Sequence, residues 1–531
     1  MGREQGPRPK QGRESGLHTR SAGILLPVSS LPSPYGIGCF GRAAYDWLDF
    51  LHKAGQSFWQ ILPLGPTGYS NSPYQCLSAF AGNPYFIDLD TLRGEGLLSR
   101  ADIEGVGWGR DDKRVDYGAV YKGRESVLRK AFSRFVEGAK PREKASFEEF
   151  ISRSRWLGDY CLYMAIKASN GQRPWTEWEK PLARRQKSAM ARAKEALAED
   201  IRYHAFTQYQ FERQWRALRG HAESKGIKII GDIPIYVSLD SADAWANPKL
   251  FLFGEDGLPA EAAGCPPDYF SPDGQYWGNP LYDWEEMART GYKWWIQRLK
   301  SSFSLYDVLR IDHFRGLESF FAIPVGAGKS KAAGKAKNGR WMPGPGMGFI
   351  NTIKKALPEA GIIAEDLGYQ TDEVRSLLTA SGFPGMKLVQ FAFDSRAVDD
   401  PCPPYSYIEN MVVYPGTHDN DTLEGWRKSA PRDSILAAME YTGTERESKL
   451  PLAMMRLVLQ CSANLVVIPM QDWLGLGSTA RINTPSTISR NNWSWRLGRD
   501  TEYARLAGHI ARMAYLYGRS PEREKKRRRN H

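Results

Sequence analysis

Three carboxylate side chains stand where short apolar runs of the sequence end. Asp312 closes the run in VLRIDHF, Glu365 follows GIIA, and Asp419 follows MVVYPGTH. A carboxylate at the tip of a buried strand is costly unless it is paired or used in chemistry. The carboxyl ends of the strands of a parallel barrel open into one mouth, so we expect these three side chains to converge there. The pattern therefore predicts an active site built from carboxylates.

Two carboxyl groups about 5–5.5 Å apart across a glycosidic bond can perform a double displacement. One of them acts as the nucleophile and must be ionised, while the other acts first as a general acid and must be protonated. Arg310 lies two residues before Asp312 and on the same face of a strand, so we expect it to keep Asp312 ionised. An apolar wall or a neighbouring carboxylate would keep the acid protonated.

Metal binding is the other common use of carboxylates beside histidines. His418 precedes Asp419, and His313 follows Asp312. Neighbours on a strand point to opposite faces, which makes chelation by either pair awkward, and we expect no metal site. The sequence also contains no GxSxG, no GxGxxG opening a helix and no HExxH, which leaves acyl transfer, dinucleotide chemistry and zinc proteolysis without support.

A glycine-lysine-serine triplet at 328–330 resembles the end of a phosphate-binding loop. The first glycine of that motif would fall on Ile323, and Pro324 would lie inside the loop. We therefore do not expect nucleotide binding there.

Eight short apolar runs predict the strands that position these groups. They are Gly23–Ser29, Phe58–Leu64, Ile227–Val237, Val308–Phe314, Gly361–Leu367, Met386–Phe391, Met411–Thr417 and Asn464–Met470. Helical segments such as Ala43–Ala54 and Tyr292–Lys300 lie between them. Continuous apolar runs are typical of parallel strands covered on both faces, so the pattern predicts a (β/α)8 TIM barrel. An open doubly wound sheet would show similar runs, and the converging carboxylates favour the barrel.

We expect one catalytic barrel over residues 21–518, without a C-terminal β-sandwich domain. Its interruptions are a mainly helical insertion at about 91–222, which includes the charged run Arg184–Glu199, and a mobile Lys-rich loop at 326–340. Residues 1–20 and 519–531 are expected to be flexible basic tails.

The net charge of +12 comes from three segments rather than from the chain as a whole. Residues 1–20 carry +3, residues 326–340 carry +5 and residues 519–531 carry +5, so the remaining chain carries about −1. A folded nucleic-acid groove would require a basic domain, and we expect no nucleic-acid partner. The sequence has no apolar run of about 18 residues and begins without a secretory apolar core, so we expect no membrane association and a cytoplasmic location.

Aromatic residues gather in predicted loops rich in Gly, Pro and Asn. These loops are GYSNSPY at 68–74, the stretch from PPDYF to QYWGN at 266–279, and NNWSW at 491–495. Turn-forming residues fix such side chains at the surface, where tyrosine and tryptophan are suited to bind sugars.

These loops and strand ends belong to long motifs shared with one family. LPLGPTGYSNSPYQ, IGDIPIYV, PPDYFSPDGQYWGNPLY, RIDHFRG, AEDLG, GTHDNDT and INTPST closely resemble the amylomaltases. These are 4-α-glucanotransferases, also called disproportionating enzymes, of the α-amylase superfamily.

The resemblance implies a role for each residue that falls on a motif. It implies that Asp312 is the nucleophile, that Glu365 is the general acid and base, and that Asp419 distorts the sugar and stabilises the transition state. Arg310 and His418 would hold the nucleophile and the reacting sugar. The remaining residues implied to contact glucan are Ser72, Tyr74, Asp232, Asp268, Gln275, Trp277 and Asn483.

The implied reaction passes part of an α-1,4-glucan donor to glucose or a maltooligosaccharide as acceptor, without a cofactor or metal. A hydrolase of the same superfamily would share the three carboxylates, and the acceptor-loop motifs favour transfer over hydrolysis. A glycan-binding or nucleic-acid-associated protein on an inactive barrel is disfavoured because all three carboxylates are present.

Overall fold

The structure is a computed structural model that describes residues 15–267, 273–325, 336–396, 402–498 and 503–522. Its central feature is a sheet of eight parallel strands in the order β10-β11-β12-β1-β2-β3-β6-β9. The strands are β1 (Ser21–Leu25), β2 (Phe58–Gln60), β3 (Lys228–Pro234), β6 (Val308–Asp312), β9 (Gly361–Ala364), β10 (Gly385–Leu388), β11 (Met411–Tyr414) and β12 (Leu465–Pro469). The two edge strands meet where the N–H of Ala364 donates a 2.9 Å hydrogen bond to the carbonyl of Pro384. The predicted TIM barrel is confirmed, and each predicted strand corresponds to one of these eight.

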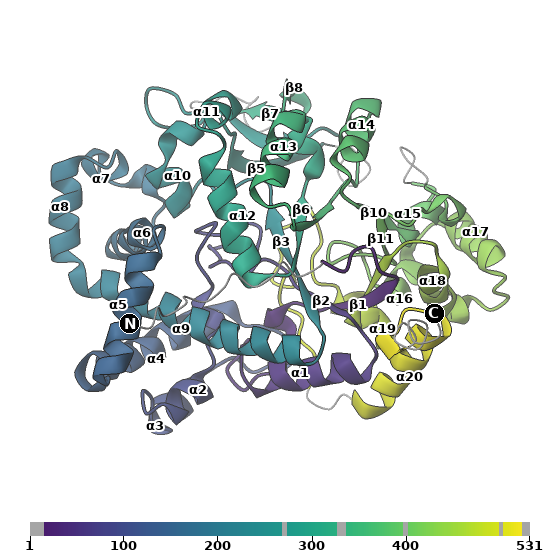
Figure 1. Ribbon diagram of the computed structural model, residues 1–531, viewed down its shortest axis with the longest axis horizontal. Helices are drawn as coiled ribbons and strands as arrows, with labels where there is room; N and C mark the ends of the chain where they lie inside the picture. Colours follow the sequence, from purple (N-terminus) through teal and green to yellow (C-terminus); the bar gives the residue numbers. More distant parts are fainter. Residues whose placement is uncertain (1–14, 268–272, 326–335, 397–401, 499–502, 523–531) are drawn as a thin grey trace, which may run out of the picture.

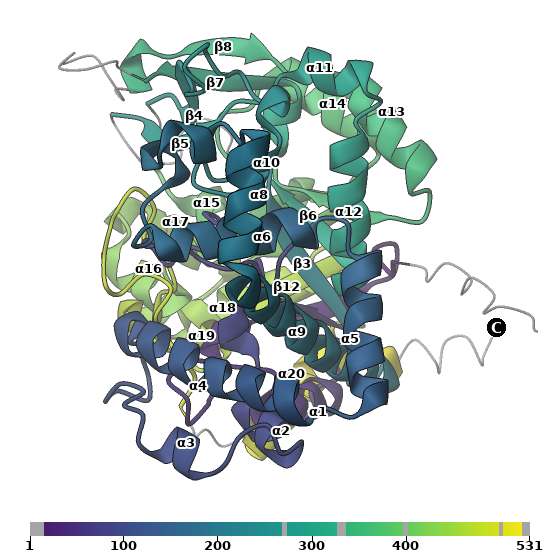
Figure 2. The same ribbon diagram turned by 90° about the vertical axis from the view of Figure 1, so that its left-hand side faces the viewer.

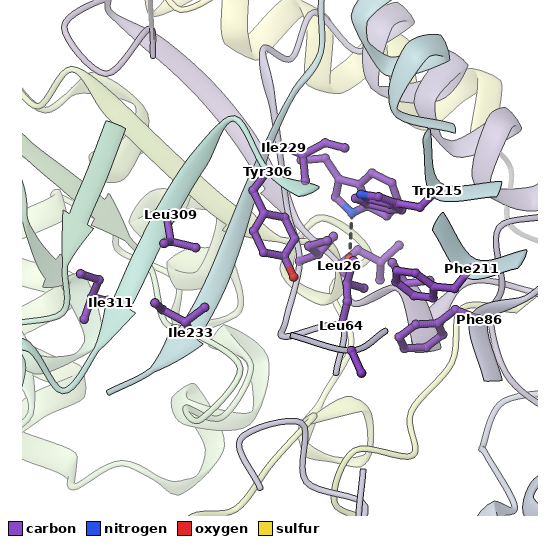
Figure 3. Close-up of a cluster of buried hydrophobic side chains, with 14 of the residues drawn as sticks. Leu26, Leu64, Phe86, Phe211, Trp215, Ile229, Ile233, Tyr306, Leu309 and Ile311 are labelled. Carbon is purple, nitrogen blue, oxygen red and sulfur yellow. Dashed lines mark hydrogen bonds between the residues drawn. The ribbon is translucent and has the colours of Figure 1, made fainter. Parts of the chain in front are cut away.

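The alternation of side chains along each strand separates two apolar clusters. On β3, Ile229 and Ile233 face outward, while Ile230 faces the barrel interior with residues such as Val308 and Val467. Figure 3 shows outward-facing Ile229 beside Trp215 of the long helix α9 (Ala198–Ser224). Each strand is therefore covered on both faces, as its unbroken apolar run requires.

Several strands end earlier than their apolar runs. The run after β1 becomes a 3-10 turn (Val28–Ser30), and the run after β10 becomes the helix α15 (Val389–Phe393). Pro27, Pro63 and Pro415 follow strand ends and have no N–H to donate to a ladder. The catalytic end of the barrel therefore consists largely of irregular backbone, on which the predicted site residues after the strands lie.

Helices surround the barrel and fill the long connection between β2 and β3 (Figure 1). That connection, expected to be a helical insertion at about 91–222, contains α2 (Leu89–Gly94), α3 (Ala101–Glu104), α4 (Tyr117–Gly138), α5 (Pro141–Arg153), α6 (Leu157–Ser169), α7 (Lys180–Ala183), α8 (Lys187–Ala196) and α9. The other helices are α1 (Arg42–Lys53), α10 (Ala242–Ala246), α11 (Trp284–Arg289), α12 (Lys293–Leu305), α13 (Gly346–Ala356), α14 (Asp372–Ser381), α15, α16 (Leu423–Ser429), α17 (Arg432–Thr442), α18 (Leu450–Gln460), α19 (Met470–Trp473) and α20 (Tyr503–Leu516).

A second sheet, absent from the sequence prediction, stands at the catalytic end of the barrel. It is antiparallel, in the order β5-β4-β7-β8, and consists of β4 (Glu261–Cys265), β5 (Gln275–Pro280), β7 (Ser319–Pro324) and β8 (Arg340–Pro343). Two of its strands follow β3 and two follow β6, so it grows from loops at the carboxyl ends of the barrel strands. Figures 1 and 2 both place β7 and β8 near α13 and α14.

The predicted tail and loop boundaries need correction. Leu17 and Arg519 are buried, and the Arg519 guanidinium donates hydrogen bonds to the carbonyls of Leu459, Ser21 and Cys461. The hydrogen bonds to these carbonyls offset the cost of burying the charged guanidinium. Residue 519 therefore belongs to the folded domain and not to the tail. The Lys-rich loop is likewise shorter than predicted, since Ala336 is buried and β8 begins at Arg340.

No helix in the described ranges is both long and apolar enough to cross a membrane.

Candidate active site

Arg310 joins two carboxylates inside the barrel. On β6 the alternation that sends Leu309 and Ile311 outward turns Arg310 and Asp312 inward. Arg310 Nη1 lies 2.7 Å from Oδ2 of Asp232 on β3 and 3.0 Å from Oδ1 of Asp312. Arg310 and Asp232 are 3 % and 0 % exposed, whereas the Asp312 side chain is 29 % exposed. The buried pair of Arg310 and Asp232 therefore holds Asp312, whose carboxylate reaches the mouth.

Burial dominates the charge state of Asp312. Desolvation raises its pKa to about 6, and the positive charge of Arg310 opposes that rise. The carboxylates of Asp232 and Asp419 act in the same direction as burial. The sequence predicts that Arg310 keeps Asp312 ionised. In the structure Arg310 limits the rise in the pKa of Asp312 but does not cancel it. Asp312 remains mainly ionised at pH 7, which a nucleophile needs.

Glu365 follows β9 directly, and backbone donors hold both of its carboxylate oxygens. Oε2 accepts a 2.7 Å hydrogen bond from the N–H of His313, and Oε1 accepts a 2.8 Å hydrogen bond from the N–H of Leu367. Burial raises the pKa of Glu365 to about 7, although Arg310 and the two N–H groups lower it. A carboxyl group with this pKa keeps a large protonated fraction near neutral pH, as a general acid requires.

Asp419, in contrast to Glu365, favours the ionised state. Its Oδ1 accepts a 2.6 Å hydrogen bond from Asn483 Nδ2, and its Oδ2 lies 3.2 Å from His418 Nε2. Burial raises its pKa, but His418 and Asn483 outweigh burial and bring it to about 2. His418 and Asp419 lie in the loop after β11 and touch each other. The prediction that these neighbours point apart was therefore wrong, because strand alternation ends at Tyr414.

Tyr74 connects the two halves of the site. Its hydroxyl donates a 2.8 Å hydrogen bond to Asp232 Oδ2, and its ring stacks on His418 with centroids 5.2 Å apart and planes at 13°. The Ser72 hydroxyl accepts a 3.3 Å hydrogen bond from the N–H of Tyr74, which fixes the start of this turn. The structure thus brings Ser72, Tyr74, Asp232 and His418 together.

Gln275 and Trp277 approach the same mouth from β5. Trp277 Nε1 donates a 3.1 Å hydrogen bond to Gln275 Oε1, and its ring packs edge-on against His313, with centroids 4.8 Å apart. His313 is the residue after Asp312, so this strand borders the predicted nucleophile. Asp268, the remaining predicted contact residue, lies outside the described residues.

The sequence prediction missed how Glu365 is oriented. His313 has φ = 59°, and this left-handed conformation accompanies the hydrogen bond from its N–H to Glu365. Histidine adopts that conformation more readily than most residues, and its place at a strand end was the one signal available. Trp493, one of the predicted loop aromatics, also belongs to the site, because it lies against Tyr74 with ring centroids 5.8 Å apart.

Comparisons with known proteins agree with this arrangement. The family model described as 4-alpha-glucanotransferase matches residues 26–501. A 4-alpha-glucanotransferase of Clostridium butyricum is 45 % identical over 93 % of this chain and 99 % of its own length. One of Thermus thermophilus is 46 % identical over 90 % of this chain and 95 % of its own.

The structural comparison gives the same result. The solved amylomaltase of Streptococcus agalactiae in complex with acarbose has a TM-score of 0.89 and 38 % sequence identity, covering 94 % of this chain and 100 % of its own. The converging carboxylates, the barrel and the extent of these matches agree, and the chain belongs to the 4-alpha-glucanotransferase family.

Proposed function

We propose that the protein transfers segments of an α-1,4-glucan from a donor maltooligosaccharide to the 4-hydroxyl of an acceptor glucan. The observation that carries the proposal is the convergence of three carboxylates in three different settings. Asp312 lies beside Arg310, two backbone N–H groups hold Glu365, and Asn483 and His418 hold Asp419. The pKa of Glu365 is about 7, that of Asp312 is about 6 and that of Asp419 is about 2. One group is thus suited to be an acid beside two that are ionised, which is what a retaining double displacement needs.

The first half of the reaction breaks the donor chain. The Asp312 carboxylate attacks the anomeric carbon while the bond from that carbon to the leaving oxygen breaks. Glu365 passes its proton to the leaving oxygen, and the reducing-end segment departs with a free 4-hydroxyl. The remaining segment is bonded to Asp312 as a β-linked ester. Arg310, 3.0 Å from Asp312, helps to hold the attacking group in place.

The second half reverses these roles. Glu365, now ionised, takes the proton from the 4-hydroxyl of the acceptor, whose oxygen attacks the anomeric carbon and releases Asp312. Two inversions give net retention and a new α-1,4 bond. Asp419, held ionised by Asn483 and His418, stabilises the positive charge that develops on the sugar ring. The scheme uses no cofactor or metal.

The choice of acceptor separates this proposal from a hydrolase with the same carboxylates. Trp277 packs against His313 beside the nucleophile, and Tyr74 packs against His418. Aromatic walls on both sides of the mouth disfavour water and suit a second sugar as acceptor. We propose glucose and maltooligosaccharides as acceptors. The expected cytoplasmic location and the expected absence of a nucleic-acid partner stay predictions.

Incubation of the pure protein with maltotriose tests the proposal. Transfer gives free glucose together with maltopentaose and longer chains, while the total number of reducing ends stays constant. A rise in reducing ends with only short sugars would mean hydrolysis. Chromatography of the products combined with a reducing-end assay distinguishes the two results.

A further inference from the structure

Two exposed aromatic rings stand together on segments that follow barrel strands β6 and β9, and the proposed mechanism does not use them. Trp341 on β8 is 39 % exposed, and Tyr369, in the loop after β9, is 49 % exposed. Their ring centroids are 6.4 Å apart and their planes differ by 22°. Exposed aromatic rings that lie nearly parallel form a flat apolar surface, which suits a binding platform.

A buried arginine supports this platform from below. The Arg315 guanidinium carbon lies 3.9 Å from the centroid of the Trp341 ring and 5.6 Å from that of Tyr369. Arg315 is 4 % exposed, and its Nη1 donates a 2.8 Å hydrogen bond to the carbonyl of Tyr369. The cation therefore holds both rings in place, so a sugar that binds on them restricts little side-chain motion.

The platform is attached to the catalytic residues through very short segments. Arg315 is three residues after Asp312, and Tyr369 is four residues after Glu365. A chain extends at most about 3.5 Å per residue, so the platform lies within roughly 14 Å of the catalytic backbone. That distance corresponds to a few sugar units beyond the bond that reacts.

The register of the four-stranded sheet shows where the exposed platform ends. Tyr276 pairs with Gly264, Gly264 pairs with Phe321, and Phe321 pairs with Trp341. Directly paired residues of antiparallel strands point to one face of the sheet, so these side chains share a face. Phe321 is only 6 % exposed and packs with Ile323 and Ala336, so it separates Tyr276 from Trp341. The open platform therefore consists of Trp341 and Tyr369.

We propose that Trp341 and Tyr369 form an outer glucan-binding subsite on the acceptor side. This inference rests on the proposed transfer reaction. Glu365 must face the leaving oxygen and later the acceptor hydroxyl, and Tyr369 stands on the loop that Glu365 begins. Glucosyl rings present C–H faces that pack on aromatic rings, and two adjacent exposed rings suit a chain of more than one unit. The subsite therefore serves acceptors of several units and lies beyond the reach of glucose.

Extension of two labelled acceptors tests the subsite. Glucose and maltotetraose, each with ¹⁴C in the reducing-end glucose, are supplied at trace concentration with unlabelled maltoheptaose as donor. Extension lengthens the labelled product, whereas use of maltotetraose as a donor shortens it. In Trp341→Ala and in Tyr369→Ala we expect the efficiency for maltotetraose relative to glucose to fall about 10-fold, equivalent to about 1.4 kcal/mol. Trp341→Phe, which keeps a ring, should hold this ratio within about 2-fold.

Tyr441→Ala provides the matched control. Tyr441 is also an exposed tyrosine, 44 % accessible, and it packs against Phe393 with centroids 5.3 Å apart, on helix α17. Its loss should leave the acceptor ratio unchanged. An unchanged ratio in both alanine variants at the platform would overturn the subsite, and so would an equal fall for both acceptors. If the unsubstituted protein extended neither acceptor, the transfer reaction itself would fail and the subsite with it.

Discussion

The backbone N–H of His313 donates a 2.7 Å hydrogen bond to Oε2 of Glu365. His313 is the residue after Asp312, so the chain that carries the proposed nucleophile also holds the proposed acid and base. The link depends on the left-handed conformation of His313, with φ = 59°. The positions of the two carboxyl groups are therefore coupled through a single peptide unit.

Two substitutions at His313 should differ because of this conformation. A left-handed residue costs roughly 1–2 kcal/mol, and more when the side chain is β-branched, whereas asparagine tolerates it. We expect His313→Val to lower kcat/KM about 100-fold and His313→Asn to lower it less than about 10-fold. Both variants lose the ring that packs on Trp277, so the difference between them reports the backbone. Equal losses would contradict the proposed link.

Charge-neutral replacements at the three carboxylates test the chemistry directly. Asp312→Asn, Glu365→Gln and Asp419→Asn keep the shape of each side chain and remove its charge or its titration. Each should reduce maltotriose turnover by several orders of magnitude, with thermal unfolding close to that of the unsubstituted protein. Near-normal turnover in any one of them would remove that residue from the mechanism.

The pH dependence of kcat/KM follows from the two raised pKa values. Asp312 must lose its proton, so activity should rise as pH increases through about 6. Glu365 must keep its proton, so activity should fall as pH increases through about 7. The expected profile is a narrow bell with its maximum between these values. A flat profile from pH 5 to pH 8 would show that these groups do not control the reaction.

The sequence was sufficient for the barrel because its strands are continuous apolar runs, and the same runs located Asp312 and Glu365 at strand ends. It was insufficient where pairing between distant segments decides the structure. The strands of the second sheet, such as EAAGC and QYWGNP, contain glycine and proline and have no clear period, so only their mutual hydrogen bonds define them. For the same reason the alignment of Tyr276 with Trp341 could not be predicted.

The position of Arg519 shows how a composition-based boundary fails. A run of basic residues predicts a solvated tail, yet the first arginine of this run is 0 % exposed. Its role depends on the carbonyl groups of Ser21, Leu459 and Cys461, which are remote in sequence and accept its hydrogen bonds. No pattern near residue 519 reveals those acceptors.

Two truncations test whether Arg519 belongs to the fold. Removal of residues 519–531 deletes the buried guanidinium and its hydrogen bonds, although Arg20 still donates to the carbonyls of Leu459 and Cys461. We therefore expect the free energy of unfolding to fall by about 2 kcal/mol or more. Removal of residues 523–531 keeps Arg519 and its hydrogen bonds, and should change that free energy by less than about 0.5 kcal/mol. Denaturant unfolding of both truncated chains measures the difference. Equal stability of the two would mean that the bonds of Arg519 add nothing to the fold, and a large loss in the shorter deletion would place stabilising contacts beyond residue 522.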